Sequence, residues 1–363
     1  MQAVLLVGGE GTRLRPLTCK TVKAMVPILN RPFLEHLVSY LAQHGIDDII
    51  LTLCYLPDTI EKYFGDGSGF GVKLTYVMEE SPLGTAGAVK NAERYLDDTF
   101  FVFNGDIFTD LDLKAMLSFH REQKAKATIA LTPVDDPTAY GVVEMDSCPR
   151  VGRFVEKPKR EEVTSNLINA GTYILERDVL TEIPPETRFM FEHHLFPTLL
   201  RNGSLICGYP SDAYWIDIGT PQKYCQVQYD LLQGKGRTSL YSRSRREEMS
   251  CGARSSIHPM AKVEGPVVIG DDCSIGPHVQ LKGPAVIGNN CRILDGAIVE
   301  RSILWSSVLV GKKACLEDCI VGNNSSIGEG SFVGEGSVIG ENVTVTDGSR
   351  VEPAEKIWPD TEV

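Results

Sequence analysis

The stretch IGDDCSIGPHVQLKGPAVIGNNCRI, residues 269–293, carries an aliphatic residue at every sixth position. A period of six fits neither an α-helix, whose period is about 3.6 residues, nor a strand with two alternating faces. It is typical of a parallel β-helix, in which each short strand points one aliphatic side chain inwards and glycine or asparagine permits the following corner. This stretch therefore predicts a β-helix.

The repeat continues in both directions. We expect about six coils from about residue 255, with three hexapeptides in each coil. A slip of four residues between Val299 and Ile303 predicts one irregular corner. Cys273 and Cys291 are one coil apart, so we expect them side by side as reduced thiols. The inward positions predicted are Ile257, Val263, Ile269, Ile275, Leu281, Ile287, Ile293, Val299, Ile303, Leu309, Cys315, Val321, Ile327, Val333, Ile339, Val345, Val351 and Ile357.

Upstream, residues 1–233 alternate strand-like apolar runs with amphipathic helical stretches, which predicts an α/β domain with a mostly parallel sheet. Residues 234–254 are polar and basic and are interpreted as a linker before a β-helix domain at 255–363. Ligands of such sheets bind beyond the carboxyl ends of the strands, so motifs that follow strands matter most. The expected strands are 3–7, 49–53, 72–78, 99–103, 128–132 and 172–175, and the expected helices 33–44, 85–94 and 113–124.

Composition narrows the function classes. The 363 residues hold 48 acids and 36 bases, a net charge of −12, which argues against nucleic-acid and anionic membrane partners. The negative net charge does not exclude phosphorylated ligands, because binding them requires only a few cations near the site. No apolar run approaches a membrane span, residues 1–7 lack the pattern of a signal peptide, and the ten cysteines contain no CxxC pair. We therefore expect a cytoplasmic protein with reduced thiols.

A glycine turn follows the first expected strand. It is Gly8-Gly9-Glu10-Gly11-Thr12-Arg13, and four cations, Arg13, Arg15, Lys20 and Lys23, lie within eleven residues of one another. Glycines let backbone N–H groups approach phosphates, and the clustered cations suit a triphosphate. The turn is neither a Walker loop nor a dinucleotide fingerprint. A solvated basic loop is the alternative interpretation.

Two aspartates also follow strand-like runs. Asp106 ends Asn104-Gly105-Asp106, and Asp217 precedes a turn and a helix; each could bind Mg²⁺ or simply cap a helix. Asp110 and Asp112 are expected to cap the helix at 113. Lys157 follows Glu156 at another strand end, where it could contact a monophosphate or form a surface ion pair.

Together these motifs resemble the sugar-nucleotide pyrophosphorylase (nucleotidyltransferase) family, most closely its mannose-1-phosphate guanylyltransferases. The resemblance covers nearly the whole chain, and the ordered motifs that carry it are Gly-Gly-x-Gly-Thr-Arg-Leu-x-Pro-Leu-Thr, Asn-Gly-Asp, Phe-Val-Glu-Lys-Pro, Asn-Ala-Gly and Trp-x-Asp-Ile-Gly. The resemblance implies a Rossmann-like mixed-sheet catalytic domain followed by a left-handed β-helix of hexapeptide repeats.

The resemblance also assigns residue roles. It implies that the nucleotide and its phosphates contact Leu6, Gly8, Gly9, Gly11, Thr12, Arg13, Lys23 and Asp106, and that the base-recognition segment includes Glu79, Gly84 and Thr85. The sugar phosphate would contact Gly141, Glu156, Lys157 and Asn169, and Asp106 and Asp217 would bind Mg²⁺. The catalytic groups would be Arg13, Lys23, Asp106 and Asp217. The family's Pro-Lys-Pro is replaced by Val22-Lys23-Ala24, so the stiffening prolines are missing.

The implied function is nucleotide-sugar synthesis, with GTP and mannose 1-phosphate giving GDP-mannose and pyrophosphate. Glucose-1-phosphate uridylyl- or thymidylyltransfer is the near alternative. A non-catalytic regulatory paralogue that binds sugar nucleotide and an acyltransferase using His258 or His278 are more distant ones. The β-helix is expected to act as a scaffold and to mediate homo-oligomerisation.

Overall fold

The computed structural model describes residues 1–146, 149–241 and 249–363. They form two compact units that do not follow chain order. The first contains Met1–Gly9 and Leu37–Asp217, and the second contains Glu10–His36 and Ile218–Val363. The basic run 242–248 of the expected linker lies outside the described residues, and the domain boundaries at 233 and 255 stay a prediction.

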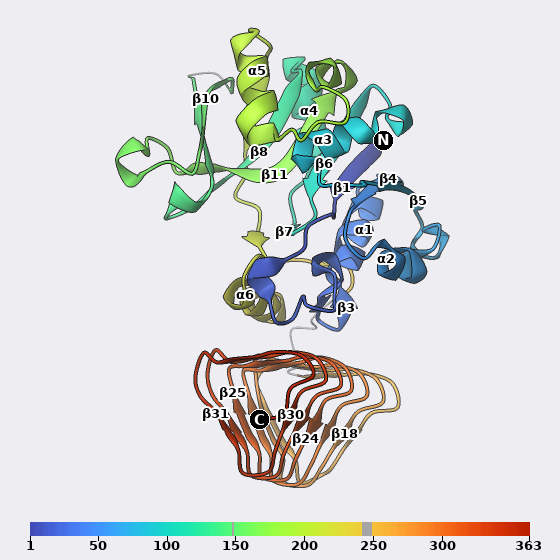
Figure 1. Cartoon of the computed structure of the whole chain (residues 1–363), viewed down its shortest axis with the longest axis vertical. Coiled ribbons are helices and arrows are strands. Elements are labelled where there is room, and N and C mark those ends of the chain that lie inside the picture. Colours follow the sequence, from blue (N-terminus) through green and yellow to red (C-terminus); the bar gives the residue numbers. More distant parts are fainter. Residues whose placement is uncertain (147–148, 242–248) are drawn as a thin grey trace. The chain divides into compact units, whose positions relative to one another are not determined.

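The first unit is built on a nine-stranded mixed sheet with the order β10-β9-β11-β6-β1-β4-β5 and a branch from β11 through β8 to β12 (Figure 1). The central β1 is parallel to β4 and β6, and β11 runs antiparallel to β6. Ala3, Val4 and Leu5 are fully buried, as expected for a strand covered on both faces. The strands are β1 (Gln2–Leu6), β4 (Asp48–Leu53), β5 (Lys73–Met78), β6 (Thr99–Asn104), β8 (Ala127–Pro133), β9 (Gly141–Met145), β10 (Val151–Glu156), β11 (Leu167–Glu176) and β12 (Ile206–Pro210).

Short elements and helices complete this part of the chain. Asp112 caps α4 by accepting hydrogen bonds from the backbone N–H groups of Lys114 and Ala115, as expected, whereas Asp110 accepts one from Tyr214 instead. No helix in the described ranges is long and apolar enough to cross a bilayer. The elements are β7 (Ile107–Thr109), β13 (Trp215–Asp217), α1 (Phe33–Gln43), α2 (Pro57–Phe64), α3 (Gly84–Asn91), α4 (Leu113–Gln123) and α5 (Phe196–Arg201).

The second unit contains the predicted β-helix, in which strands of successive coils pair in parallel within three sheets (Figure 1). The first sheet has seven strands and the other two have six each, which confirms about six coils. The first sheet comprises β14 (Met249–Cys251), β17 (Val267–Ile269), β20 (Ala285–Ile287), β23 (Ile303–Leu304), β26 (Ile320–Val321), β29 (Val338–Ile339) and β32 (Lys356–Ile357). The second comprises β15 (Ser256–Ile257), β18 (Ser274–Ile275), β21 (Arg292–Ile293), β24 (Leu309–Val310), β27 (Ser326–Ile327) and β30 (Thr344–Val345). The third comprises β16 (Lys262–Glu264), β19 (Gln280–Lys282), β22 (Ile298–Glu300), β25 (Cys315–Glu317), β28 (Phe332–Val333) and β31 (Arg350–Val351).

The predicted slip of four residues is wrong. Ile287 pairs with Leu304, and the next inward residues are Val310 and Leu316, so Ile303, Leu309 and Cys315 each stand one position too early. One residue is lost at the corner between the third and first sheets in two successive coils, between Val299 and Leu304 and again between Leu316 and Val321. Both residues of β23 and both residues of β24 are aliphatic, so each of these strands offers two candidate inward positions in the sequence.

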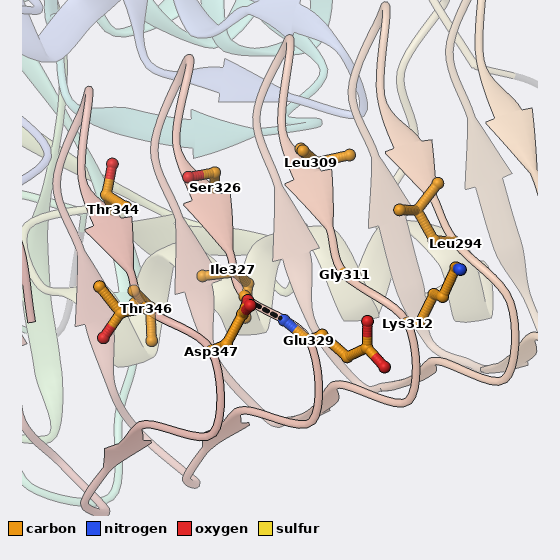
Figure 2. A pocket seen from close by; sticks show the side chains of 12 residues that line it. Leu294, Leu309, Gly311, Lys312, Ser326, Ile327, Glu329, Thr344, Thr346 and Asp347 are labelled. Carbon is orange, nitrogen blue, oxygen red and sulfur yellow. Dashed lines mark hydrogen bonds between the residues drawn. The ribbon is translucent and has the colours of Figure 1, made fainter.

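Side-chain oxygens at the corners bind the backbone of the neighbouring coil. Asp347 accepts a hydrogen bond from the N–H of Glu329 at 2.7 Å in the groove that crosses the second sheet (Figure 2). Asn289 accepts one from Asp271 at 2.8 Å in the same way. Cys273 and Cys291 are buried free thiols on adjacent coils, as predicted from their spacing. The corners therefore repeat at the spacing of one coil.

The corrected frame gives a direct stability test with a matched control. Leu304→Ala should lower the free energy of unfolding by about 2–5 kcal/mol, because it empties a fully buried position. Leu309→Ala should cost less than about 1 kcal/mol, because that side chain is 37% exposed. Urea unfolding of both variants would measure the difference, and a larger loss at Leu309 would contradict the frame.

Candidate active site

Three motifs that are far apart in the sequence meet at the carboxyl end of β6. The first, Asn104-Gly105-Asp106, leaves β6, and the second, Asn169-Ala170-Gly171, forms an irregular stretch of β11. The third is β13, whose Trp215 donates its indole N–H to the carbonyl of Ala170 at 2.9 Å. The Asn-Gly-Asp, Asn-Ala-Gly and Trp-x-Asp motifs therefore belong to one site.

Glycines make this close approach possible. Gly171 has φ +67°, and a Cβ on it would stand 2.6 Å from Asn104 Nδ2 and 2.4 Å from the tip of Ile107. A Cβ on Gly105 would stand 2.5 Å from the carbonyl oxygen of Leu6. Any larger residue at either position would push the strand ends apart.

The two candidate metal-binding carboxylates lie at this point. β13 pairs with β7 so that Asp217 stands opposite Ile107, the residue that follows Asp106. Asn104 adds a buried Oδ1 with no hydrogen-bond partner among residues 1–146, 149–241 and 249–363. The backbone therefore brings two carboxylates and an amide oxygen to the same strand ends.

The candidate base-recognition segment borders the end of β1. Glu79 Oε1 would stand 3.6 Å from a Cβ on Gly8, and Glu79 Oε2 accepts a hydrogen bond from the N–H of Leu83 at 2.9 Å. Burial raises the pKa of Glu79, an effect that the Leu83 hydrogen bond partly offsets. Gly9 has open space where a side chain would point. Leu6 is the last residue of β1, and its side chain is half-buried.

The turn into α3 is held by the segment around Phe189. Gly84 has φ +74°, and a Cβ there would stand 2.8 Å from the carbonyl oxygen of Phe189. Thr85 accepts a hydrogen bond from the N–H of Phe191 at 3.0 Å and donates one to Glu192 at 3.4 Å. The Thr85 hydroxyl thus fixes this wall of the site, a positioning role beside its predicted role in base recognition.

Glu192 is a site residue that the sequence analysis missed. It also accepts a hydrogen bond from the buried hydroxyl of Tyr173 at 3.4 Å, and that hydroxyl accepts one from Asn169 Nδ2 at 2.8 Å. Asn169 Oδ1 in turn accepts one from the N–H of Gly171. Glu192 therefore links the Thr85 side to the Asn169 side, and no local motif marks it.

Glu156 and Lys157 lie together at the end of β10. A Cβ on Gly141 would stand 2.8 Å from Glu156 Oε2 and 2.6 Å from the ring of Phe154, so this position requires glycine. Burial and the charge of Glu192 raise the pKa of Glu156. Lys157 Nζ lies 3.9 Å from Glu156 and is 67% exposed, so its ammonium group can reach a ligand from solvent.

The glycine turn continues into the second unit. Gly11 has φ +66° and lies directly against the side chain of Lys23: a Cβ added to Gly11 would stand 2.9 Å from Lys23 Cβ. Lys23 is 9% exposed and begins a short 3₁₀ helix, Lys23–Met25, whereas Thr12 and Arg13 are exposed. The candidate triphosphate cations thus belong to the second unit, and the two aspartates to the first.

Comparison with known families identifies both parts of the chain. Residues 2–234 match the family model described as Nucleotidyl transferase, and residues 246–351 match the EIF2B subunit epsilon LbH domain, a left-handed β-helix. The fold class expected from the motifs, a Rossmann-like mixed-sheet domain followed by a left-handed β-helix, is confirmed.

Individual relatives cover most of the chain. The mannose-1-phosphate guanylyltransferase of Mycobacterium tuberculosis is 42% identical over 272 residues, 74% of this chain and 75% of the relative. The mannose-1-phosphate guanyltransferase of Debaryomyces hansenii is 41% identical over 340 residues, 90% of this chain and 87% of the relative. The crystal structure of HddC from Yersinia pseudotuberculosis complexed with GMP-PN is 33% identical, with a TM-score of 0.56 over 63% of this chain and 99% of that chain.

The close approach at Gly171 predicts a large stability difference between two glycine variants. Gly203→Ala introduces a Cβ at φ +73° in open space and should cost about 1–2 kcal/mol of backbone strain. Gly171→Ala meets similar strain together with contacts to Asn104 and Ile107, so we expect a loss of about 3 kcal/mol or more. Urea unfolding would compare them, and equal losses would show that the strand ends tolerate a side chain.

Proposed function

Because the chain belongs to the nucleotidyl transferase family, we propose that it transfers a nucleotidyl group from an NTP to a sugar 1-phosphate and releases pyrophosphate. GTP and mannose 1-phosphate are the proposed substrates, and GDP-mannose is the product. The observation that carries the proposal is the convergence of Asn104, Asp106, Asn169 and Asp217 at one set of strand ends. Relatives named mannose-1-phosphate guanylyltransferases support the choice of GTP and mannose 1-phosphate.

The chemistry needs no protein base. An oxygen of the sugar 1-phosphate attacks the α-phosphorus in line, a new P–O bond forms, and the bond to the departing pyrophosphate breaks. A phosphate monoester has a second pKa of about 6, so its nucleophilic oxygen is already largely deprotonated at pH 7. The barrier comes from bringing anions together and aligning them, which positive charge and positioning reduce.

The donor set fits a magnesium ion. Asp106 and Asp217 supply hard carboxylate oxygens, and the buried Oδ1 of Asn104 lies at the same strand ends. Within the described ranges no group of three or more His, Cys, Asp or Glu could hold a metal by itself. Mg²⁺ takes one or two carboxylates and completes its shell with phosphate oxygens and water. Bound there, Mg²⁺ would neutralise phosphate charge.

The remaining residues divide between the two anions. Arg13 and Lys23 neutralise the triphosphate, and the open space at Gly9 leaves room for its oxygens beside the backbone of the glycine turn. Lys157 contacts the sugar phosphate, and Glu156 and Asn169 contact sugar hydroxyls. Burial and the charge of Glu192 raise the pKa of Glu156.

Two alternatives keep the same fold. Glucose-1-phosphate uridylyltransfer has support from a relative of that name in Synechocystis, 36% identical over 88% of this chain. A non-catalytic paralogue is disfavoured because Arg13, Lys23, Asp106 and Asp217 are all present. For acyl transfer the support is weak, because His258 accepts a backbone hydrogen bond from Met260 and His278 pairs with Asp295 in exposed turns.

Cellular location and assembly also remain proposals. We propose a cytoplasmic enzyme, supported by nine free thiols among the described cysteines, and thiol titration of protein purified without reductant would test it. We also propose self-association through the β-helix, where Leu309 is exposed in the groove of Figure 2. Sedimentation of the purified chain would measure its oligomeric state.

Substrate choice is tested by pyrophosphate release with four NTPs against mannose 1-phosphate and glucose 1-phosphate. GTP with mannose 1-phosphate should give the highest kcat/KM. Preference for UTP or dTTP would overturn the substrate assignment and leave the reaction class intact. No release with any pair would overturn the reaction class.

Asp106→Asn and Asp217→Asn should each lower kcat/KM about 100-fold or more, because each removes a charged ligand from a hard cation. Excess Mg²⁺ should restore little activity. Asp112→Asn is the matched control, since Asp112 caps α4 and should leave turnover near that of the native chain. Near-normal rates in both site variants would contradict the two-carboxylate site.

A further inference from the structure

One outer face of the β-helix is apolar and buried. In the five inner strands of the first sheet, the residue before the inward position points away from the β-helix interior, yet it is 7% exposed or less. The corresponding residues of the second sheet are mostly polar. We call the apolar row the docking row; its members are Val268, Val286, Ile303, Ile320 and Val338.

Helix α6 (Pro221–Gln233), which belongs to the same unit, packs beside this row. Ile320 and Val338 line one pocket together with Cys225 and Tyr229 of the helix. The short corner before β23 contributes the carbonyl of Arg301, to which the Tyr229 hydroxyl donates a hydrogen bond.

The second short corner contacts the same hydroxyl. Asp318 Oδ1 lies 3.1 Å from it, and Asp318 also pairs with Arg301 at 3.2 Å. Both short corners, at 299–304 and 316–321, therefore lie beside α6.

A buried hydrogen-bond chain leads from the β-helix through α6 to the segment Glu10–His36. Trp305, which follows β23, donates its indole N–H to the Tyr224 hydroxyl at 2.9 Å. Tyr224 donates to the carbonyl of Pro27 at 2.5 Å. One turn further along α6, Gln228 accepts a hydrogen bond from the N–H of Leu29 at 3.1 Å. Trp305, Tyr224 and Gln228 are all fully buried.

The segment also contacts the corners that follow the first sheet. Asn30 donates to the carbonyl of Ile287 at 2.7 Å. Near the C-terminus, Thr21 donates to Glu341 at 2.5 Å, and Lys20 Nζ lies 2.6 Å from the carboxylate of Asp360. Lys23 therefore lies between two anchored stretches, 20–21 on one side and 27–30 on the other.

We propose that the β-helix, through Trp305, Tyr224 and the Asp360 corner, positions the segment that carries Arg13 and Lys23 for binding of the triphosphate. Val22 and Ala24 stand where the family has prolines, so they do not stiffen the backbone beside Lys23. The contacts on both sides of Lys23 supply that rigidity instead. A mobile cation must be ordered by its ligand, which weakens binding, so a held lysine binds phosphate more tightly. The inference rests on the proposed function.

Tyr224→Phe is the central variant, because it removes the hydroxyl at the centre of the chain and keeps the ring. We expect KM for the NTP to rise about five- to tenfold, as for the loss of a buried hydrogen bond or two, with KM for the sugar 1-phosphate unchanged. Lys20→Asp and Asp360→Lys should each raise KM for the NTP about two- to threefold, since the pair is exposed, and the double variant should recover.

Asp272→Asn is the matched control for Asp360. Asp272 pairs with Arg254 at 2.6 Å on the same series of corners and makes no hydrogen bond or ion pair to Glu10–His36 in the described part of the chain. It should leave both KM values unchanged. Equal rises of KM for both substrates in Tyr224→Phe, or a double charge exchange that fails to recover, would overturn the proposal.

Hydrogen exchange separates this proposal from the function it rests on. In Tyr224→Phe, amides of residues 10–36 should exchange about five- to tenfold faster, matching the lost hydrogen bonds, while those of the β-helix keep their native protection. Unchanged exchange in residues 10–36 would overturn the positioning proposal even in a fully active enzyme. A native chain inactive with every NTP would overturn the proposed function, and the exchange result would still decide the positioning.

Discussion

The approach of β11 to the end of β6 at Gly171 is the contact on which the first unit's chemistry depends. With no Cβ at Gly171, Asn104 and Ile107 fit against β11, and β7 can then pair with β13. This pairing sets Asp217 beside Asp106. The hydrogen bonds of Asn169 to Tyr173 and Gly171 keep the irregular strand in shape, so Asn169 and the two carboxylates share one framework.

The second unit is organised by a different constraint, the need to cover an apolar outer face of the β-helix. Hexapeptide coils alone would leave Val286, Ile303 and Ile320 in water at a cost of about 1.5–3 kcal/mol for each side chain. Helix α6 packs beside Ile320 in this row, and it carries Tyr224 and Gln228 to the Lys23 segment. The same burial that stabilises the β-helix thus supports the segment that we propose to bind the triphosphate.

Much of this could be predicted from the sequence, because the strongest patterns are local. The period of six identified the β-helix. The glycine turn and Asp106 stood out by their position after strands, and Asp217 by its place before a turn and a helix. The two short corners were misplaced because β23 and β24 each carry two aliphatic residues, so one strand gives two candidate frames. An aliphatic pair in nearly every third strand, at 267–269, 285–287, 303–304 and 320–321, marks the buried sheet and could have revealed the docking row.

Other parts lay beyond sequence reasoning. Glu192 joins Thr85 to Tyr173 only through tertiary contacts, and nothing in its neighbourhood distinguishes it from a surface glutamate. The grouping of Glu10–His36 with the C-terminal part also has no sequence signal, since Lys20 and Asp360 are separated by 340 residues.

Direct phosphoryl transfer is tested most directly by following the α-phosphorus of GTP. With the label on that atom, the proposed attack predicts that it appears in a sugar nucleotide only when sugar 1-phosphate is present, while pyrophosphate leaves unlabelled. The protein should carry no label, and labelled pyrophosphate should not exchange into GTP when the sugar nucleotide is absent. Label bound to the protein, or exchange without sugar nucleotide, would show a covalent intermediate and contradict the account.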